Sequence, residues 1–341
     1  MGRIEPVRGG FIIMTMTNAQ LLKRLDRIEK AAMTTSGMNA GLLNPEQSKE
    51  FFRMAFDTTP FSQLHRKEMR KAKQGELDKI AIGGRILRKK TENSDDNYRA
   101  GVQTSKIEYN TKAIRLPWEI TEELLRENIE GEGYEDTVMA LMSTQLGIDL
   151  EDLHWNGDTE SSDGMLSIND GWLKKIKKSK ESHIVDHAKL VTGTGEAAAA
   201  NGFGKGSIFA LSGAMPNKYK NSNLRWIMSP SRREKWIEYL TNRPTGAGDA
   251  ALLGAGDQVN KPMGYGIVTV PSLEDDVIIL ADPKNFIAVN TYDTRVRKTT
   301  EGKTAVMEDK RFYVIHFDDD AVIQEMDAVA ILTNIPDTFG A

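Results

Sequence analysis

Hydrophobic residues at helical spacing mark the N-terminal part of the chain. Between Thr17 or Asn18 and about Ala32 they recur every three or four positions and predict a helix. The apolar face of this helix would consist of Leu21, Leu22, Leu25 and Ile28. Basic side chains lie elsewhere on it: Lys23, Arg24, Arg27 and Lys30. Because a polar loop over 34–43 follows, we expect an amphipathic arm that moves independently.

A second helix is predicted directly after the arm. Asn44 is a suitable N-cap, Pro45 favours the first helical position, and Gln47 completes a capping box. Its apolar side chains are Phe51, Phe52 and Phe56. Pro60 ends the helix.

Alternating polar and apolar residues then predict a long β-hairpin. Ile80 and Ile82 alternate in one arm, and Ile107 and Tyr109 alternate in the other. After Tyr109 the apolar positions shift from odd to even numbers, which indicates a bulge or bend within 110–113. The hairpin tip is almost entirely polar and should project into solvent or onto a neighbouring subunit. Its candidate contact residues are Arg85, Arg88, Lys89, Lys90, Glu92, Asp95, Asp96 and Arg99.

The strongest helical pattern runs from about Tyr134 to His154. Its apolar residues are Val138, Leu141, Met142, Leu146, Leu150 and Leu153. A short helix capped by Thr121 precedes it. A loop over 155–171 with a short hairpin is expected after it, and regular structure resumes at Trp172.

From Gly202 onward, short helices and strands alternate, which predicts an α+β lobe. Helices are expected from Phe209 to Met215 and after a cap at Ser229 or Ser231, with strands at 224–228, 266–270, 276–281 and 285–289. The closing part should contain a strand at 311–317, an acidic step at 318–320, and a strand at 327–332.

Composition excludes several classes of chemistry. The 341 residues include no cysteine, so disulfides, zinc-thiolate clusters and thiol nucleophiles are excluded. The hydrophobic share of 39% and the charged share of 28% are typical of a folded protein of one or two domains. No apolar run approaches the length of a membrane span or a signal core. A net charge of −4 argues against a dedicated nucleic-acid binder, so contact with DNA should be weak and local.

Three motifs invite a catalytic or ligand-binding interpretation. The glycine-rich segment 202–207 resembles a phosphate loop, but Ala199 and Gly206 stand where glycine and Ser or Thr are needed, so a flexible domain junction is favoured. His183 and His187 have metal-ligand spacing but no third ligand, and an exposed surface is favoured. The acidic runs 274–276 and 318–320 lack the glycine of a calcium loop and predict turns and a solvated rim. No Gly-x-Ser-x-Gly motif is present. Catalytic, cofactor and metal sites are therefore all expected to be absent.

The order of these elements, together with several short segments, resembles a known family. The segments are Ile114–Ile129 (IRLPWEITEELLRENI), Trp155–Asp158, Arg225–Pro230, Gly264–Gly266, Ile279–Asp282 and Phe317–Ile335. They are similar to major capsid proteins of tailed bacteriophages, which have the Hong Kong 97-type fold. The likeness covers roughly 44–335. The chain lacks the long charged coiled segment that some members carry before the arm, so scaffolding would come from elsewhere.

The resemblance implies an α+β fold with five parts. These are an N-terminal arm with the first helices (1–64), an extended loop (65–115), a peripheral domain with a spine helix near 134–154 (116–203), an axial domain (204–291), and return strands (292–341).

The resemblance also implies a function without catalysis. Pentamers and hexamers would form an icosahedral virion shell around double-stranded DNA, assembled in the host cytoplasm with scaffolding and portal proteins and without a membrane or cofactor. The basic side chains of the arm would either face the shell interior, in contact with DNA or a scaffolding protein, or form a solvated helix face. In some members a lysine of the extended loop is joined to an asparagine of a neighbour, and Lys89 or Lys90 lies in the comparable region. Two alternatives stay open: an encapsulin-type compartment, and a small-molecule enzyme that uses the 202–290 lobe.

Overall fold

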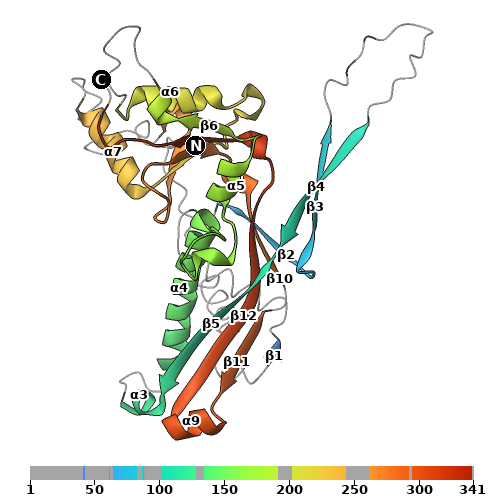
Figure 1. The fold of residues 1–341 in the computed structure, drawn as a ribbon, viewed down its shortest axis with the longest axis vertical. Helices are drawn as coiled ribbons and strands as arrows, with labels where there is room; N and C mark the ends of the chain where they lie inside the picture. Colours follow the sequence, from blue (N-terminus) through green and yellow to red (C-terminus); the bar gives the residue numbers. More distant parts are fainter. Residues whose placement is uncertain are drawn as a thin grey trace, which may run out of the picture.

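Two β-sheets and one long hairpin organise the part of the chain that the structure describes (Figure 1). The structure is a computed structural model, and it describes residues 41–42, 61, 64–82, 87, 89, 101–127, 134–190, 202–242, 261–291 and 294–339. The helices expected over 17–32 and 44–60 lie outside these residues. None of the described helices is both long enough and apolar enough to cross a bilayer.

The first sheet has six strands in the order β1-β11-β12-β10-β2, with β5 also paired to β12. Their bounds are β1 Gly41–Leu42, β2 Arg66–Arg70, β5 Lys112–Thr121, β10 Phe286–Thr291, β11 Arg295–Thr299 and β12 Lys310–Ile323. One face packs on the long helix α4 (Tyr134–Asn156) through the stacked rings of Trp118 and Tyr313 and neighbouring apolar side chains. The short helices α3 (Glu122–Glu127) and α9 (Lys303–Glu308) lie together at the lower end in Figure 1.

The second sheet has five strands in the order β6-β13-β9-β7-β8. Their bounds are β6 His183–Asp186, β7 Arg225–Met228, β8 Gly266–Thr269, β9 Ile278–Ala281 and β13 Val329–Thr333. Helices α6 (Lys205–Ala214) and α7 (Pro230–Thr241) cover one face, and α7 begins at the predicted cap, Ser229. Because β9 is covered on both faces, all four of its residues are buried.

An aromatic cluster joins the end of α4 to both sheets. Phe61, Trp155, Trp172 and Phe286 lie within 5.9 Å of one another, measured between ring centroids, and all four are fully buried. Trp172 opens the helix α5 (Trp172–Lys178), as its position after the polar loop predicts. The remaining short elements are 3-10 helices: Leu166–Ile168, His187–Lys189, Asn217–Tyr219, Pro262–Gly264, Pro283–Asn285 and Met326–Ala328.

The predicted hairpin is confirmed. Strands β3 (Gln74–Ile82) and β4 (Val102–Asn110) pair antiparallel, with Gln74 opposite Asn110 and Ile82 opposite Val102. The shift of apolar phase has a clear cause: β4 pairs with β3, whereas β5, which begins one residue after Thr111, pairs with β12. The chain therefore changes sheet at the predicted bend.

Two expectations about loops are corrected. The loop 155–171 contains turns and a 3-10 helix rather than a hairpin, because Asp163 and Asp158 hold backbone amides within it. The segment 202–207 is not a flexible junction. Phe203 is fully buried, and a side chain at Gly204 would come within 2.8 Å of the Tyr239 ring.

Sheet membership also crosses the expected domain limits. Strand β6 lies before residue 204 but belongs to the five-stranded sheet, and β10 lies before residue 292 but belongs to the six-stranded sheet. Local sequence carries no signal for either pairing, because the partner strands are far away along the chain.

Helix α4 matches its prediction to within two residues at the C-terminal end. Leu146, Leu150 and Leu153 are buried as their spacing indicates, whereas Leu141 is 62% exposed. Glu151 is only 4% exposed, and neither of its carboxylate oxygens has a hydrogen-bond partner among the described residues. Burial raises the pKa of Glu151 to about 7; nearby His154 opposes the shift and Asp152 adds to it.

The raised pKa of Glu151 predicts a pH-dependent stability. The unfolded chain releases this proton near pH 4.5 and the folded chain near pH 7, so stability is lost as pH rises between these values. Glu151→Gln removes the buried charge. We expect the unassembled variant to exceed the wild type in unfolding free energy above pH 7 by about 3 kcal/mol at most, with the gain vanishing toward pH 4.5. Urea unfolding at several pH values measures it.

The matched control is Glu123→Gln, which changes an exposed glutamate of α3. It should leave the pH dependence of unfolding unchanged. A Glu151→Gln protein whose stability follows that of the wild type at every pH would contradict the assignment of a buried charge.

Candidate functional site at the base of the hairpin

Most of the predicted contact residues lie outside the described part of the chain. In the hairpin tip Lys89 is described and exposed, as is Leu87, which is 93% exposed. The other tip candidates, Arg85, Arg88, Lys90, Glu92, Asp95, Asp96 and Arg99, are not described, nor are the arm candidates Lys23, Arg24, Arg27 and Lys30. Both sets remain predictions, and the site that the structure does describe is the base of the hairpin.

Three consecutive aspartates in β12 form the centre of this base. Asp318, Asp319 and Asp320 are between 1% and 4% exposed, so the expected solvated turn is wrong at these positions. Strand β12 runs through them without interruption. We refer to the three as the carboxylate cluster.

The position of the cluster explains its burial. On β12, pairing with β11 covers 312–316 and pairing with β10 covers 319–323, while pairing with β5 ends at Asp319. The neighbours of β12 therefore change at these three residues. Such discontinuities leave polar groups without regular sheet partners, and buried carboxylates can accept hydrogen bonds from them.

Asp318 and Asp319 connect β12 to other segments of the body. Asp318 accepts hydrogen bonds from Lys73 Nζ at 3.0 Å and Thr291 Oγ1 at 2.9 Å. Asp319 contacts His154 Nε2 at 2.8 Å and accepts from Asn290 Nδ2, also at 2.8 Å. They link the turn before β3, the end of α4 and strand β10.

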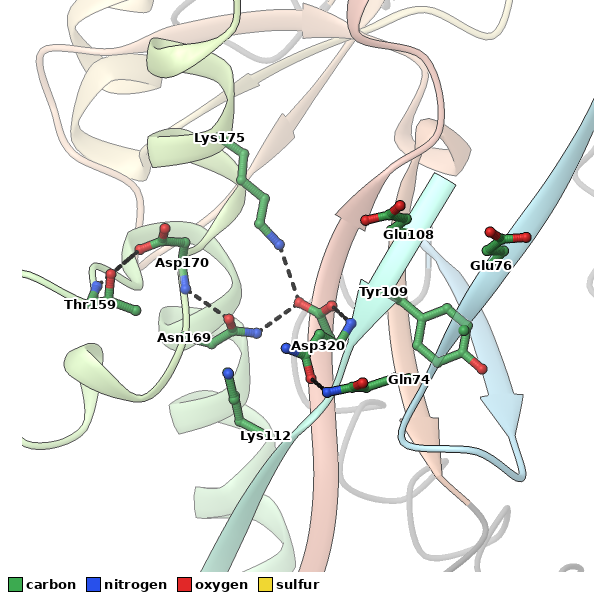
Figure 2. Close-up of a pocket in the computed structure, with 12 residues that line it drawn as sticks. Gln74, Glu76, Glu108, Tyr109, Lys112, Thr159, Asn169, Asp170, Lys175 and Asp320 are labelled. Atoms are coloured by element: carbon green, nitrogen blue, oxygen red, sulfur yellow. Dashed lines mark hydrogen bonds and ion pairs between the residues drawn. The ribbon is translucent and has the colours of Figure 1, made fainter. Parts of the chain in front are cut away.

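Asp320 connects β12 to the hairpin and to the covering helix α5. The backbone N–H of Asn110, the last residue of β4, donates to it at 2.8 Å. Asn169 Nδ2 donates at 2.7 Å and Lys175 Nζ at 3.2 Å. Figure 2 shows the side chains of Asn169 and Lys175 pointing toward the Asp320 carboxylate. A carboxylate with three hydrogen-bond donors can be buried at little cost, whereas burial of a carboxylate without donors would be strongly unfavourable.

Apolar contacts secure one face of the hairpin base. Leu77 and Tyr109 are 3% and 6% exposed and pack with Ile287, Val289 and Val322. Lys79 also forms an ion pair with Glu325. The first half of the hairpin is thus fixed to the body by both polar and apolar contacts, and the rest projects away from it (Figure 1).

A polar cleft of about 630 Å³ lies between the hairpin base and α5. Its lining residues are Gln74, Gly75, Glu76, Glu108, Tyr109, Asn110, Lys112, Thr159, Asn169, Asp170, Lys175 and Asp320. Glu76 and Glu108 face each other across the hairpin, and Lys106 forms an ion pair with Glu76. Among the described residues no group of three or more potential ligands is arranged to hold a metal.

The two histidines with metal-ligand spacing have separate structural roles. His187 is 2% exposed and its Nε2 lies 2.9 Å from Ser207 Oγ, so the expected exposed surface is wrong for this residue. Burial lowers the pKa of His187, and nearby Arg232 lowers it further. His183 Nε2 lies 3.1 Å from Asp327 Oδ1. The run 274–276 lies in exposed turns, as predicted.

Sequence reasoning missed the carboxylate cluster although the sequence contains a signal for it. Apolar residues flank the triplet on both sides, from Tyr313 to Phe317 and from Ala321 to Ile323. A strand pattern that resumes directly after three acids indicates one continuous strand whose acids have buried partners.

Comparisons with known proteins identify the family. No protein-family model matches the chain. A protein of Bacillus subtilis (strain 168) described as a prophage capsid protein, YqbE, is 30% identical over 333 residues, which cover 92% of this chain and 99% of the relative.

Solved structures share the fold at low sequence identity. A chain of the satellite phage P4 procapsid that includes the size determination (Sid) protein matches 94% of this chain and 98% of its own length, with a TM-score of 0.66 and 15% identity. The capsid of a native GTA particle matches 83% of this chain and 91% of its own length, with a TM-score of 0.57 and 14% identity. A chain of Gordonia phage Cozz matches 81% of this chain and 86% of its own length, with a TM-score of 0.54 and 12% identity. The α+β fold is that of capsid proteins, and the chain belongs to the family of phage major capsid proteins.

Proposed function

We propose that this capsid protein, a structural component of the virion, assembles into pentamers and hexamers of a closed icosahedral head around double-stranded DNA. The observation that carries the proposal is the hairpin, which is fixed to the body at its base and projects beyond it (Figure 1). An isolated two-stranded ribbon is marginally stable in water, so a projecting one is expected to gain order from a partner. Identical subunits that each bind a neighbour through unlike surfaces can close into a shell.

The Hong Kong 97-type division of the chain is part of this proposal. The five-stranded sheet with α6 and α7 would form the axial domain around the symmetry axes. The six-stranded sheet with α4 as the spine would form the peripheral domain, and β3 with β4 the extended loop. Relative to the limits expected from sequence, β6 would join the axial domain and β10 the peripheral one.

Partners are proposed on the same basis. Scaffolding and portal proteins would direct assembly in the host cytoplasm, and basic residues of the arm would contact packaged DNA weakly. In the proposed overlap the charged hairpin tip would lie on an adjacent subunit and pair with its surface charges.

Expression of the protein, alone and with its neighbouring genes, tests the proposed function. Sedimentation and negative-stain electron microscopy should reveal closed shells, and purified virions should contain DNA within them. A stable monomer or small oligomer under every condition would contradict the proposal and favour an enzyme that uses the 202–290 lobe. Shells filled with a cargo protein instead of DNA would indicate an encapsulin-type compartment.

Charge reversal at the hairpin tip tests the proposed overlap. With Arg88→Glu, Lys89→Glu and Lys90→Glu combined, we expect shell assembly to fail because like charges would meet at the contact, while the subunit stays folded by circular dichroism. The control combines Arg88→Lys, Lys89→Arg and Lys90→Arg, which keep the charge and should assemble normally. Normal shells from the glutamate variant would refute the role of the tip.

A further inference from the structure

The outward face of α4 carries an unusual stripe of uncharged residues. Thr137, Leu141, Thr144 and Ile148 are all exposed, with Leu141 at 62% and Ile148 at 43%. We call these four residues the outward stripe. Ala140 and Gln145, which flank it, are also exposed and uncharged. The stripe extends over about three helical turns on the side of α4 opposite the sheet.

Such a stripe indicates a helical partner. The solvent face of a surface helix normally carries charged side chains. This one carries two exposed large apolar side chains, Leu141 and Ile148, which alternate with two threonines and suggest a contact surface. Successive stripe residues are separated by four, three and four positions. This is the spacing of the apolar seam through which two helices pack side by side.

The arm predicted over 17–32 carries a matching seam. Leu21, Leu25, Ile28 and Ala32 are also separated by four, three and four positions, so the two seams have the same length. These residues lie outside the described part of the chain, and the match is one of sequence pattern. An isolated helix of this length is marginal in water and would gain stability from such a partner.

The charges of the two segments are complementary. Apart from the buried Glu151, the Asp, Glu, Lys and Arg residues of α4 are also all acidic: Glu135, Asp136, Asp149 and Asp152. The arm helix has an excess of positive charge, with Lys23, Arg24, Arg27 and Lys30 against Asp26 and Glu29. The arm is therefore attracted to α4 before the apolar seams meet.

The connection between the segments is long enough for the contact to form within one chain. Strand β1 pairs with β11 at the edge of the six-stranded sheet, three strand positions from β5, over which α4 packs. That lateral distance is about 15 Å. Since the stripe faces away from the sheet, α4 and a docked helix add roughly 20 Å in depth, so the path is about 25 Å. The eight residues of 33–40 can span about 28 Å. A short tether also raises the effective concentration of the arm to about the millimolar range, which favours the same chain over a second copy.

We propose that the outward stripe of α4 is the docking surface of the segment 17–32 of the same chain, joined as a helix pair. The contact would cover the exposed apolar side chains of α4 in the free subunit. It does not depend on the proposed shell function, because it forms within one chain.

Cysteine cross-linking tests the contact directly, since the protein has no native cysteine. Leu141→Cys is combined with Leu25→Cys, which fits a parallel pair, or with Ile28→Cys, which fits an antiparallel pair. Under mild oxidation we expect one of the two proteins to form an intramolecular disulfide at a rate independent of protein concentration. The control combines Leu141→Cys with Lys23→Cys, on the opposite face of the arm, and should react at least about tenfold more slowly.

Two outcomes would overturn the proposal. If neither seam pair reacts faster than the control, the stripe does not bind the arm. If a mixture of the single Leu141→Cys, Leu25→Cys and Ile28→Cys proteins yields covalent dimers at the rate of the double variants, the occupant is the arm of a second copy. Circular dichroism would detect whether Leu141→Cys disturbs folding. In that case Thr144→Cys replaces it, since Thr144 is an exposed polar residue of the same stripe.

Discussion

Three adjacent carboxylates in the interior of a strand would each cost several kcal/mol if they lacked hydrogen-bond donors. In this protein the donors to Asp318, Asp319 and Asp320 come from the turn before β3, strand β10, the last residue of β4, the loop before α5, and α5 itself, and α4 adds the contact of His154 with Asp319. If any of these segments moved away, a buried carboxylate would lose one of its two or three partners. The carboxylate cluster therefore fixes the positions of the hairpin, the long helix and the sheet relative to one another.

This constraint suits a capsid subunit. A projecting hairpin can transmit force or position to a neighbour only if its base is rigid. The base is held at the end of β4 by the bond of Asp320 to the Asn110 N–H, and on one face by the packing of Leu77 and Tyr109. The aromatic cluster around Trp172 fixes the junction of the two sheets. The buried carboxylates thus lie where the position of the hairpin relative to the body has to be maintained.

Periodic features were predictable from the sequence, whereas long-range partners were not. The hairpin, its bend near Thr111, and helix α4 follow from local alternation or helical spacing. The burial of Asp319 could not follow, because His154 lies 165 residues away in sequence. The exposure of Leu141 was missed for a related reason: spacing shows that a helix has an apolar face but not that it has two. Of the predicted tip residues only Lys89 is described, so that prediction still awaits its test.

Hydrogen exchange in the Asp320→Asn variant tests most directly whether the cluster fixes the hairpin. Because asparagine has a single acceptor oxygen, its NH2 group would oppose either the N–H of Asn110 or the donors of Asn169 and Lys175, and Lys175 would lose its charged partner in both cases. In the unassembled subunit we expect amides of 74–78 and 106–110 to exchange roughly tenfold faster or more, with β9 unchanged and with no effect of the exposed control Glu108→Gln. Unchanged protection of the hairpin base in Asp320→Asn would contradict the account.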